Sequence, residues 1–99
     1  MPGQVVFALR VRRWLRDELS YLAERSPAAE RRLHERVATM TRLLGEYPRI
    51  GVAATKPGMR RLVISPYVVT YRQVGDNLIE IIDMRHSRQA ERPIPEVAP

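Results

Sequence analysis

The fold is decided by residues 67–84, YVVTYRQVGDNLIEIIDM, which hold two apolar runs on either side of a turn. The first run, residues 67–74, begins with five β-branched or aromatic residues and therefore predicts a strand. Gly75-Asp76-Asn77 has the composition of a short hairpin turn, and residues 78–84 form a second, isoleucine-rich strand. Residues 59–64, which end at a Ser65-Pro66 break, precede both. Because the links are so short, we expect the three strands to pair as an antiparallel meander.

Upstream of this meander, the sequence predicts one strand and two helices. Residues 4–9 are short, apolar and β-branched, which indicates a strand. Apolar residues then recur at helical spacing in two segments, which are separated by Ser26 as an N-cap and Pro27 as a first helical residue. The apolar positions are Val11, Trp14, Leu15, Leu19 and Leu22 in the first segment, and Leu33, Val37, Met40, Leu44 and Tyr47 in the second.

These elements predict an α+β fold: an N-terminal strand, an antiparallel α-helix hairpin and a three-stranded antiparallel meander. Gly45 and Pro48 mark the expected end of the second helix, and residues 48–58 are expected to form a loop. A chain of 99 residues has room for one core, so we assign residues 1–88 to a single domain. Residues 89–99 contain three prolines, and we expect an extended or disordered tail.

The composition excludes several classes of function. There is no cysteine and there are only two histidines, so we expect no disulfide, no metal and no cofactor. No apolar run reaches the ~20 residues of a membrane span, and no basic leader is present, so we expect a cytoplasmic protein. The net charge of +6 is carried mostly by arginine and points to nucleic acid, to a nucleic-acid machine or to an acidic protein partner.

The charge is unevenly distributed along the chain. No acidic residue occurs between Glu46 and Asp76, whereas that stretch holds five basic residues: Arg49, Lys56, Arg60, Arg61 and Arg72. If the strands pair as expected, these residues form a positive edge that would attract phosphate or a carboxylate-rich surface. The alternative is a solvated rim whose arginines pair with acidic residues of the helices.

Few residues have the spacing that catalysis requires. His86, within Arg85-His86-Ser87-Arg88 at the end of the last strand, could act as a general acid or base near a phosphate. The alternative, which we favour, is a histidine that caps the sheet or bonds a neighbouring carbonyl. The sequence contains no carboxylate pair, no nucleophile–base motif and no phosphate-binding loop. Trp14 on the first helix, like the tyrosines, fits either the core or a partner-binding face.

Three segments in sequence resemble the C-terminal half of RelE/ParE toxins: residues 57–62 (PGMRRL), 67–72 (YVVTYR) and 79–86 (IEIIDMRH). Residues 26–29 (SPAA) and Tyr47-Pro48 with Gly51 are similar to the first half of that family. The resemblance spans residues 5–88. It implies one of two activities: RelE-like members are ribosome-dependent ribonucleases that cut mRNA, and ParE-like members bind and stall DNA gyrase.

The departures from the ribonuclease pattern favour the ParE type. RelE-like enzymes usually place an arginine directly after the first tyrosine of the Tyr-x-x-x-Tyr strand, where this chain has Val68. They also place basic residues at alternate positions of the preceding strand, and here Arg60 is followed by the apolar Leu62. No tyrosine occurs after Tyr71. We therefore expect no catalytic residue and an inhibitor that acts by binding.

The resemblance also implies a partner, a ParD-like or similar antitoxin with an acidic and apolar C-terminal segment, in a toxin–antitoxin hetero-oligomer. Two other readings remain open: a ribosome-dependent mRNA endonuclease, and a decayed toxin that retains only antitoxin binding. The candidate residues are Arg12, Arg13, Arg16, Arg85 and Arg88 for the target; Trp14, Tyr21, Arg60, Tyr67, Tyr71 and Arg72 for the antitoxin; and Arg60, Arg61, Arg85 and His86 for the ribonuclease alternative.

Overall fold

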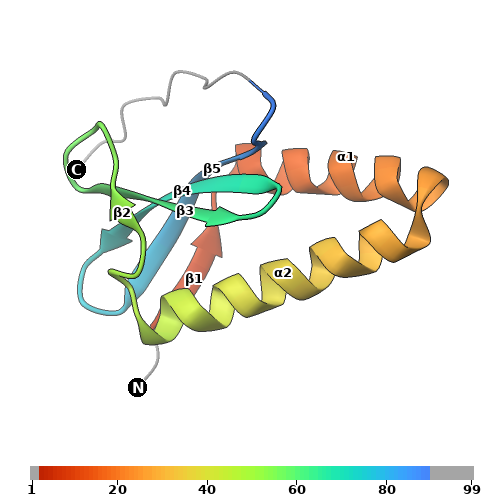
Figure 1. The fold of residues 1–99 in the computed structure, drawn as a ribbon. Helices are drawn as coiled ribbons and strands as arrows, with labels where there is room; N and C mark the ends of the chain where they lie inside the picture. Colours follow the sequence, from red (N-terminus) through yellow and green to blue (C-terminus); the bar gives the residue numbers. More distant parts are fainter. Residues whose placement is uncertain (1–2, 90–99) are drawn as a thin grey trace.

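The computed structural model describes residues 3–89, which form a helix hairpin packed on one sheet (Figure 1). The elements are β1 (Gln4–Phe7), α1 (Leu9–Arg25), α2 (Pro27–Glu46), β2 (Val52–Ala53), β3 (Met59–Ile64), β4 (Tyr67–Val74) and β5 (Leu78–His86). The strand order is β1-β5-β4-β3-β2, and all neighbours are antiparallel except β1, which runs parallel to β5. The predicted α+β class, helix hairpin and meander are therefore confirmed.

After the end of α2, one detail of the prediction was wrong. The segment expected to be only a loop contains β2, whose Val52 and Ala53 pair with Arg61 and Arg60 of β3. α2 ends at Glu46, between Gly45 and Pro48, as the sequence predicted, and Gly45 is buried in its last turn. Its carbonyl accepts the N–H of Gly3 at 2.7 Å, and a Cβ at Gly45 would lie 2.8 Å from the Gly3 oxygen. The glycine is thus required by a close chain crossing.

Tyr47 also departs from its predicted place. Its spacing put it in the apolar stripe of the second helix, but it is the C-cap of α2 and is 58% exposed. At the other end of α2, the capping prediction is confirmed, because the Ser26 Oγ accepts the N–H of Ala29 at 3.2 Å and Pro27 follows it. The assignment of residues 1–88 to one domain stays a prediction. The tail expected at residues 89–99 lies, except for Gln89, outside the described residues.

The core lies between the hairpin and one face of the sheet. Alternate residues of β4, namely Tyr67, Val69 and Tyr71, face the helices and are at most 5% exposed. They pack with Ile79, Ile81 and Met84 of β5, and with four helical side chains: Val11, Leu33, Met40 and Leu44. This contact is the reason that the helices show apolar stripes and the strands show alternation.

The second face of β4 is also buried. Val68 and Thr70 are 9% and 7% exposed, and Asp83, which lies opposite Thr70 in β5, is 3% exposed. The Asp83 carboxylate accepts a hydrogen bond from the Arg10 Nη2 at 2.6 Å, which joins the first turn of α1 to β5. Because a buried charge is costly unless it is paired, this contact is what allows an aspartate at that position.

The connection between α2 and β3 is fixed against the sheet. The N–H of Gly51 donates to the Tyr71 hydroxyl at 2.9 Å, and Arg60 donates to the Gly51 carbonyl at 2.7 Å. A Cβ at Gly51 would lie 2.7 Å from the Arg61 carbonyl oxygen, so only glycine allows this approach. The buried Tyr71 thus determines where residues 47–52 lie.

We predict that Tyr71→Phe lowers the free energy of unfolding by about 1–3 kcal/mol, because the buried N–H of Gly51 loses its acceptor. Tyr47→Phe is the matched control: it removes a hydroxyl from an exposed tyrosine and should change stability by less than about 0.5 kcal/mol. Urea unfolding measures both. Equal stability of the two variants would contradict the structural role given to the Tyr71 hydroxyl.

Candidate functional site

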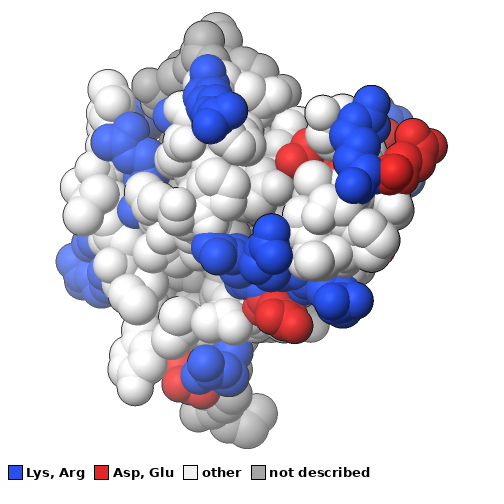
Figure 2. All heavy atoms as spheres, turned by 45° about the vertical axis from the view of Figure 1, so that its right-hand side comes forward, with Lys and Arg blue, Asp and Glu red and all other residues white. Residues whose placement is uncertain are grey.

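The surface of the protein carries its positive charge in several places. Figure 2 shows basic side chains spread over the face beside the hairpin end, with acidic side chains in fewer positions. Of the predicted positive edge, Arg72 forms an ion pair at 2.9 Å with Glu80, which belongs to the neighbouring strand β5 and not to a helix as the solvated-rim alternative expected. Arg60 instead donates to the carbonyls of Gly51 and Arg49. Arg49 is exposed and Arg61 is half-buried. The edge therefore remains positive.

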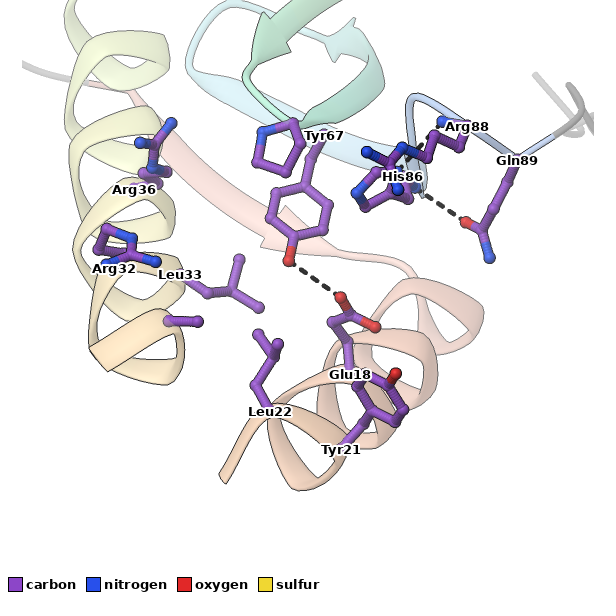
Figure 3. A pocket seen from close by; sticks show the side chains of 12 residues that line it. Glu18, Tyr21, Leu22, Arg32, Leu33, Arg36, Tyr67, His86, Arg88 and Gln89 are labelled. Carbon is purple, nitrogen blue, oxygen red and sulfur yellow. Dashed lines mark hydrogen bonds between the residues drawn. The ribbon is translucent and has the colours of Figure 1, made fainter. Parts of the chain in front are cut away.

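A cavity of about 510 Å³ lies between the helix hairpin and the ends of β4 and β5 (Figure 3). Leu22 of α1 and Leu33 of α2 form part of its apolar lining. Its polar lining comes from both helices and from the end of the sheet: Glu18, Tyr21, Arg32, Arg36, Tyr67, His86, Arg88 and Gln89. The hairpin creates this cavity because α1 and α2 extend beyond the edge of the sheet (Figure 1).

Tyr67 stands at the centre of the cavity. Its hydroxyl donates to the Glu18 Oε2 at 2.9 Å, which ties α1 to β4. Its ring makes edge contacts with Trp14 and His86, with centroid distances of 5.6 and 5.7 Å. Burial, followed by the hydrogen bond to Glu18, raises the pKa of Tyr67 from 10.0 to about 12. The phenol is therefore neutral at physiological pH and holds the Glu18 carboxylate in place.

His86 is held by its own chain. The Nδ1 accepts the N–H of Arg88 at 3.1 Å, and the backbone N–H of His86 donates to the Gln89 Oε1 at 2.8 Å. A neutral ring in this arrangement carries its proton on Nε2. His86 thus closes the end of β5 against Tyr67, an arrangement of the capping kind that the sequence favoured.

Two arginines of α2 face His86 across Tyr67. Figure 3 shows Arg32 and Arg36 on one side of Tyr67, with His86 and Arg88 on the other. Arg36 also donates to the carbonyl of Ser65, at the turn between β3 and β4. The cavity therefore has a cationic rim around a partly apolar interior, with the Glu18 carboxylate bound to Tyr67. Such a site suits a segment that carries both acidic and apolar side chains.

The sequence did not identify Glu18, Arg32 or Arg36 as site residues. Arg32 and Arg36 are four residues apart, so they share one face of α2, and Glu18 shares a face of α1 with Tyr21 and Leu22. These spacings were available as a signal. Nothing in the sequence signalled that Tyr67 lies between these faces of α1 and α2, because that position depends on how the helix hairpin lies on the sheet.

The four residues of the ribonuclease alternative do not form one group. Arg60 lies opposite Tyr71, and His86 lies opposite Tyr67, so these two are on the helix side but about 13 Å apart along β4, at about 3.3 Å per residue. Arg61 and Arg85 lie opposite Thr70 and Val68, on the other face. The Arg85 guanidinium donates to the Gln89 carbonyl at 2.9 Å.

The six antitoxin candidates divide into two groups. Tyr21 and Tyr67 line the cavity, and Trp14 contacts Tyr67 from the same helix as Tyr21. The other three have internal partners: Tyr71 is 1% exposed, and with Arg60 it holds Gly51, while Arg72 pairs with Glu80. Of the six candidates, only Tyr21 and Tyr67 therefore line the cavity, and Trp14 supports it through its contact with Tyr67.

The five target candidates are also dispersed. Arg12, Arg13 and Arg16 are exposed on α1 and lie outside the cavity lining, and Arg16 is 3.6 Å from Asp17. Arg88 is exposed and lines the cavity, whereas Arg85 is half-buried beside it in sequence. Of the five, only Arg88 therefore lines the cavity.

Residues 3–89 contain neither a metal-binding cluster nor a membrane-spanning helix. No group of three or more histidine, cysteine, aspartate or glutamate side chains there could hold a metal ion. Neither α1 nor α2 combines the length and apolar character that crossing a bilayer requires.

Comparisons with known proteins agree with this fold. The family described as the ParE toxin of the type II toxin–antitoxin system parDE matches residues 5–91. Toxin RelE2 of Caulobacter vibrioides is 36% identical over 85 residues, which cover 86% of this chain and 96% of that protein. A mutant of the Escherichia coli toxin RelE, solved in the free state, superposes with a TM-score of 0.56 at 16% identity, covering 89% of this chain and 86% of that one.

The family match over residues 5–91, together with the 36% identity to Toxin RelE2, places the chain among the toxins of the RelE/ParE superfamily, and the fold agrees with this. Within it, the chain belongs to the ParE toxin family of type II toxin–antitoxin systems. Membership in that family implies a cognate antitoxin.

The raised pKa of Tyr67 predicts a specific loss of stability in alkali. The folded protein binds this proton more tightly than the unfolded chain, so the stabilisation is complete below pH 10 and is lost as the pH rises towards about 12. We expect the free energy of unfolding to fall by up to about 2 kcal/mol more in the wild type than in Tyr67→Phe across this interval. Tyr21→Phe, which alters a half-exposed tyrosine, should keep the wild-type dependence. A Tyr67→Phe protein with the same alkaline loss as the wild type would contradict the assignment.

Proposed function

We propose that this toxin acts in the cytoplasm by binding and inhibiting DNA gyrase, and that it does not cleave RNA. The observation that supports this most strongly is Val68. It occupies the position where the ribonuclease pattern has an arginine, and it is 9% exposed, between Val63 of β3 and Arg85 of β5. Leu62, the second departure from the pattern, packs against the core.

Charge stabilisation is the reason that these positions matter. Cleavage of RNA develops negative charge on the reacting phosphate, and preorganised cations or hydrogen-bond donors at that point usually make the largest contribution to catalysis. A general acid or base alone contributes only about 10²–10⁴-fold. Because Arg61 and Arg85 lie on the face of β4 opposite to Arg60 and His86, one phosphate would not contact all four.

The ribonuclease alternative has one observation in its favour. His86, Arg88, Arg32 and Arg36 line the same cavity, and a histidine among arginines is a combination that could serve phosphate chemistry. The Glu18 carboxylate argues against it, because it is held within the same cavity by Tyr67 and would repel a phosphate. We therefore treat binding as the function and RNA cleavage as the second candidate.

For the antitoxin, we propose that its acidic and apolar C-terminal segment enters this cavity and forms a hetero-oligomer with the toxin. The apolar lining at Leu22 and Leu33 would take an apolar side chain, and the arginines of the rim would take flanking carboxylates. Tyr21 and Tyr67 supply aromatic contact area.

The gyrase proposal predicts that the purified toxin, at stoichiometric amounts, inhibits ATP-dependent supercoiling of a relaxed plasmid. mRNA on translating ribosomes should stay intact in the same preparation. His86→Ala should inhibit gyrase within about twofold of the wild type, because the histidine has no chemical step to perform. Translation-dependent mRNA cleavage that His86→Ala abolishes would establish the second candidate instead, and a toxin without effect in either assay would indicate a decayed member of the family.

The antitoxin proposal predicts that Arg32→Glu/Arg36→Glu weakens the toxin–antitoxin complex at least tenfold, or about 1.4 kcal/mol. Arg31→Glu/Arg42→Glu is the matched control, since it makes the same charge change on α2 at exposed residues outside the cavity lining. Isothermal titration with the cognate antitoxin measures both variants, and thermal melting of each free toxin checks folding. Equal weakening by the two variants would show that only net charge matters, which contradicts the cavity as the binding site.

A further inference from the structure

We infer that the segment between α2 and β3 is a second interaction surface, which docks the toxin's target through an acidic, partly apolar protein surface. This connector face consists of Tyr47, Arg49, Ile50 and Val52. The inference rests on the proposed function only in that the toxin acts by binding a target, and it does not depend on the target being gyrase.

Exposed apolar side chains are concentrated in this segment. Tyr47, Ile50 and Val52 are 58%, 44% and 63% exposed, although they lie within six consecutive residues. Residues 46–50 also line a hollow in the surface, where Glu46 provides the only carboxylate. Single exposed apolar residues are common on proteins, but a cluster of them is typical of a binding surface. None of these three side chains contributes to the buried core cluster of the described residues.

The backbone of the segment is held by several hydrogen bonds in spite of its exposure. Gly51 is held on both sides, by the Tyr71 hydroxyl at its N–H and by Arg60 at its carbonyl. The N–H of Ile50 donates to the Tyr47 carbonyl at 3.0 Å, and the N–H of Tyr47 donates to Leu43 at 2.7 Å. A partner therefore meets apolar groups that are already ordered, so binding costs little conformational entropy.

The charge of the surroundings indicates the chemistry of the partner. Residues 47–75 contain no acidic residue, and the exposed Arg49 lies between Tyr47 and Ile50. Tyrosine and arginine are the residues that most often dominate protein–protein binding energy. Nucleic acid would also be attracted by the charge, and the Tyr47 ring could stack on one base, but the aliphatic Ile50 and Val52 favour an apolar protein contact over further base stacking. An acidic protein surface with exposed apolar groups fits both properties.

The connector face lies far from the cavity. Along α2, at 1.5 Å per residue, Tyr47 lies about 16 Å from Arg36, the nearest residue of this helix that lines the cavity, and about 22 Å from Arg32. In Figure 1, the segment after α2 lies at the opposite end of that helix from the turn between α1 and α2. A partner bound only in the cavity would therefore leave the connector face open, so target and antitoxin have separate contact surfaces.

The test uses the full-length chain with Tyr47→Ser/Ile50→Ser and, separately, Arg49→Glu. Leu9→Ser/Val63→Ser is the matched control, because those two apolar residues are 53% and 63% exposed elsewhere on the molecule. The readouts are growth arrest of a bacterial host that expresses the toxin without antitoxin, and inhibition of purified DNA gyrase. We expect each connector variant to lose at least tenfold in potency in both assays, and the control variant to lose less than twofold. All three variants should melt at the wild-type temperature.

Several results would overturn the proposal. Full potency of Tyr47→Ser/Ile50→Ser would exclude an apolar contact between the connector face and the target. An equal loss of potency in the Leu9→Ser/Val63→Ser control would show that the effect is not specific to the connector face. If Arg49→Glu abolishes retention of a DNA duplex while Tyr47→Ser/Ile50→Ser does not, the face binds nucleic acid. If the wild type arrests growth without inhibiting gyrase and the connector variants do not arrest growth, the docking surface stands and the gyrase assignment fails. A wild type inactive in both assays would overturn both.

Discussion

The burial of β4 on both faces is the constraint on which the rest of this structure depends. Residues 67–71 are all less than 10% exposed, which is possible because the hairpin covers Tyr67, Val69 and Tyr71 while Val68 and Thr70 lie buried on the other face. Through hydrogen bonds of its two tyrosines, this strand also orders segments at both of its ends. Tyr67 binds Glu18 and forms the centre of the cavity, whereas Tyr71 binds Gly51 and fixes the segment that carries Tyr47 and Ile50. One strand thus positions both of the proposed interaction surfaces.

The same constraint separates this chain from the ribonuclease pattern. A cation at position 68 would have to be buried beside Val63 and close to Arg85, and an unpaired charge in such a place costs several kcal/mol. The valine instead lies buried on the face of β4 that points away from the helix hairpin. Exposed basic residues are found at the rim of the cavity, on the outer faces of both helices and at Arg49 beyond α2, where they remain available for ionic contacts with acidic partners. Stability of the central strand and a role in binding are therefore consistent with each other.

Local patterns were sufficient to predict the meander, the helix hairpin and the cap at Ser26, because each of these depends on residues close together in the sequence. The errors arose where distant segments meet. Residue 45 is a glycine because Gly3 crosses it closely, and β2 forms where Tyr71 and Arg60 hold Gly51 against β3. For the site, Tyr21 and Tyr67 were among the candidates that proved to line the cavity, but Arg32, Arg36 and Glu18 were not recognised. Their roles follow from the angle of the hairpin on the sheet, which periodicity alone does not define.

The most direct test of the central claim is to induce the wild-type toxin in cells and to follow plasmid topology and ribosome-bound mRNA together. Topoisomer gels report gyrase activity, and primer extension on a translated message reports cleavage. An inhibitor that acts by binding predicts progressive loss of negative supercoiling, or broken DNA, while the message remains full length. A truncated message at the onset of growth arrest, with plasmid supercoiling unchanged, would contradict it.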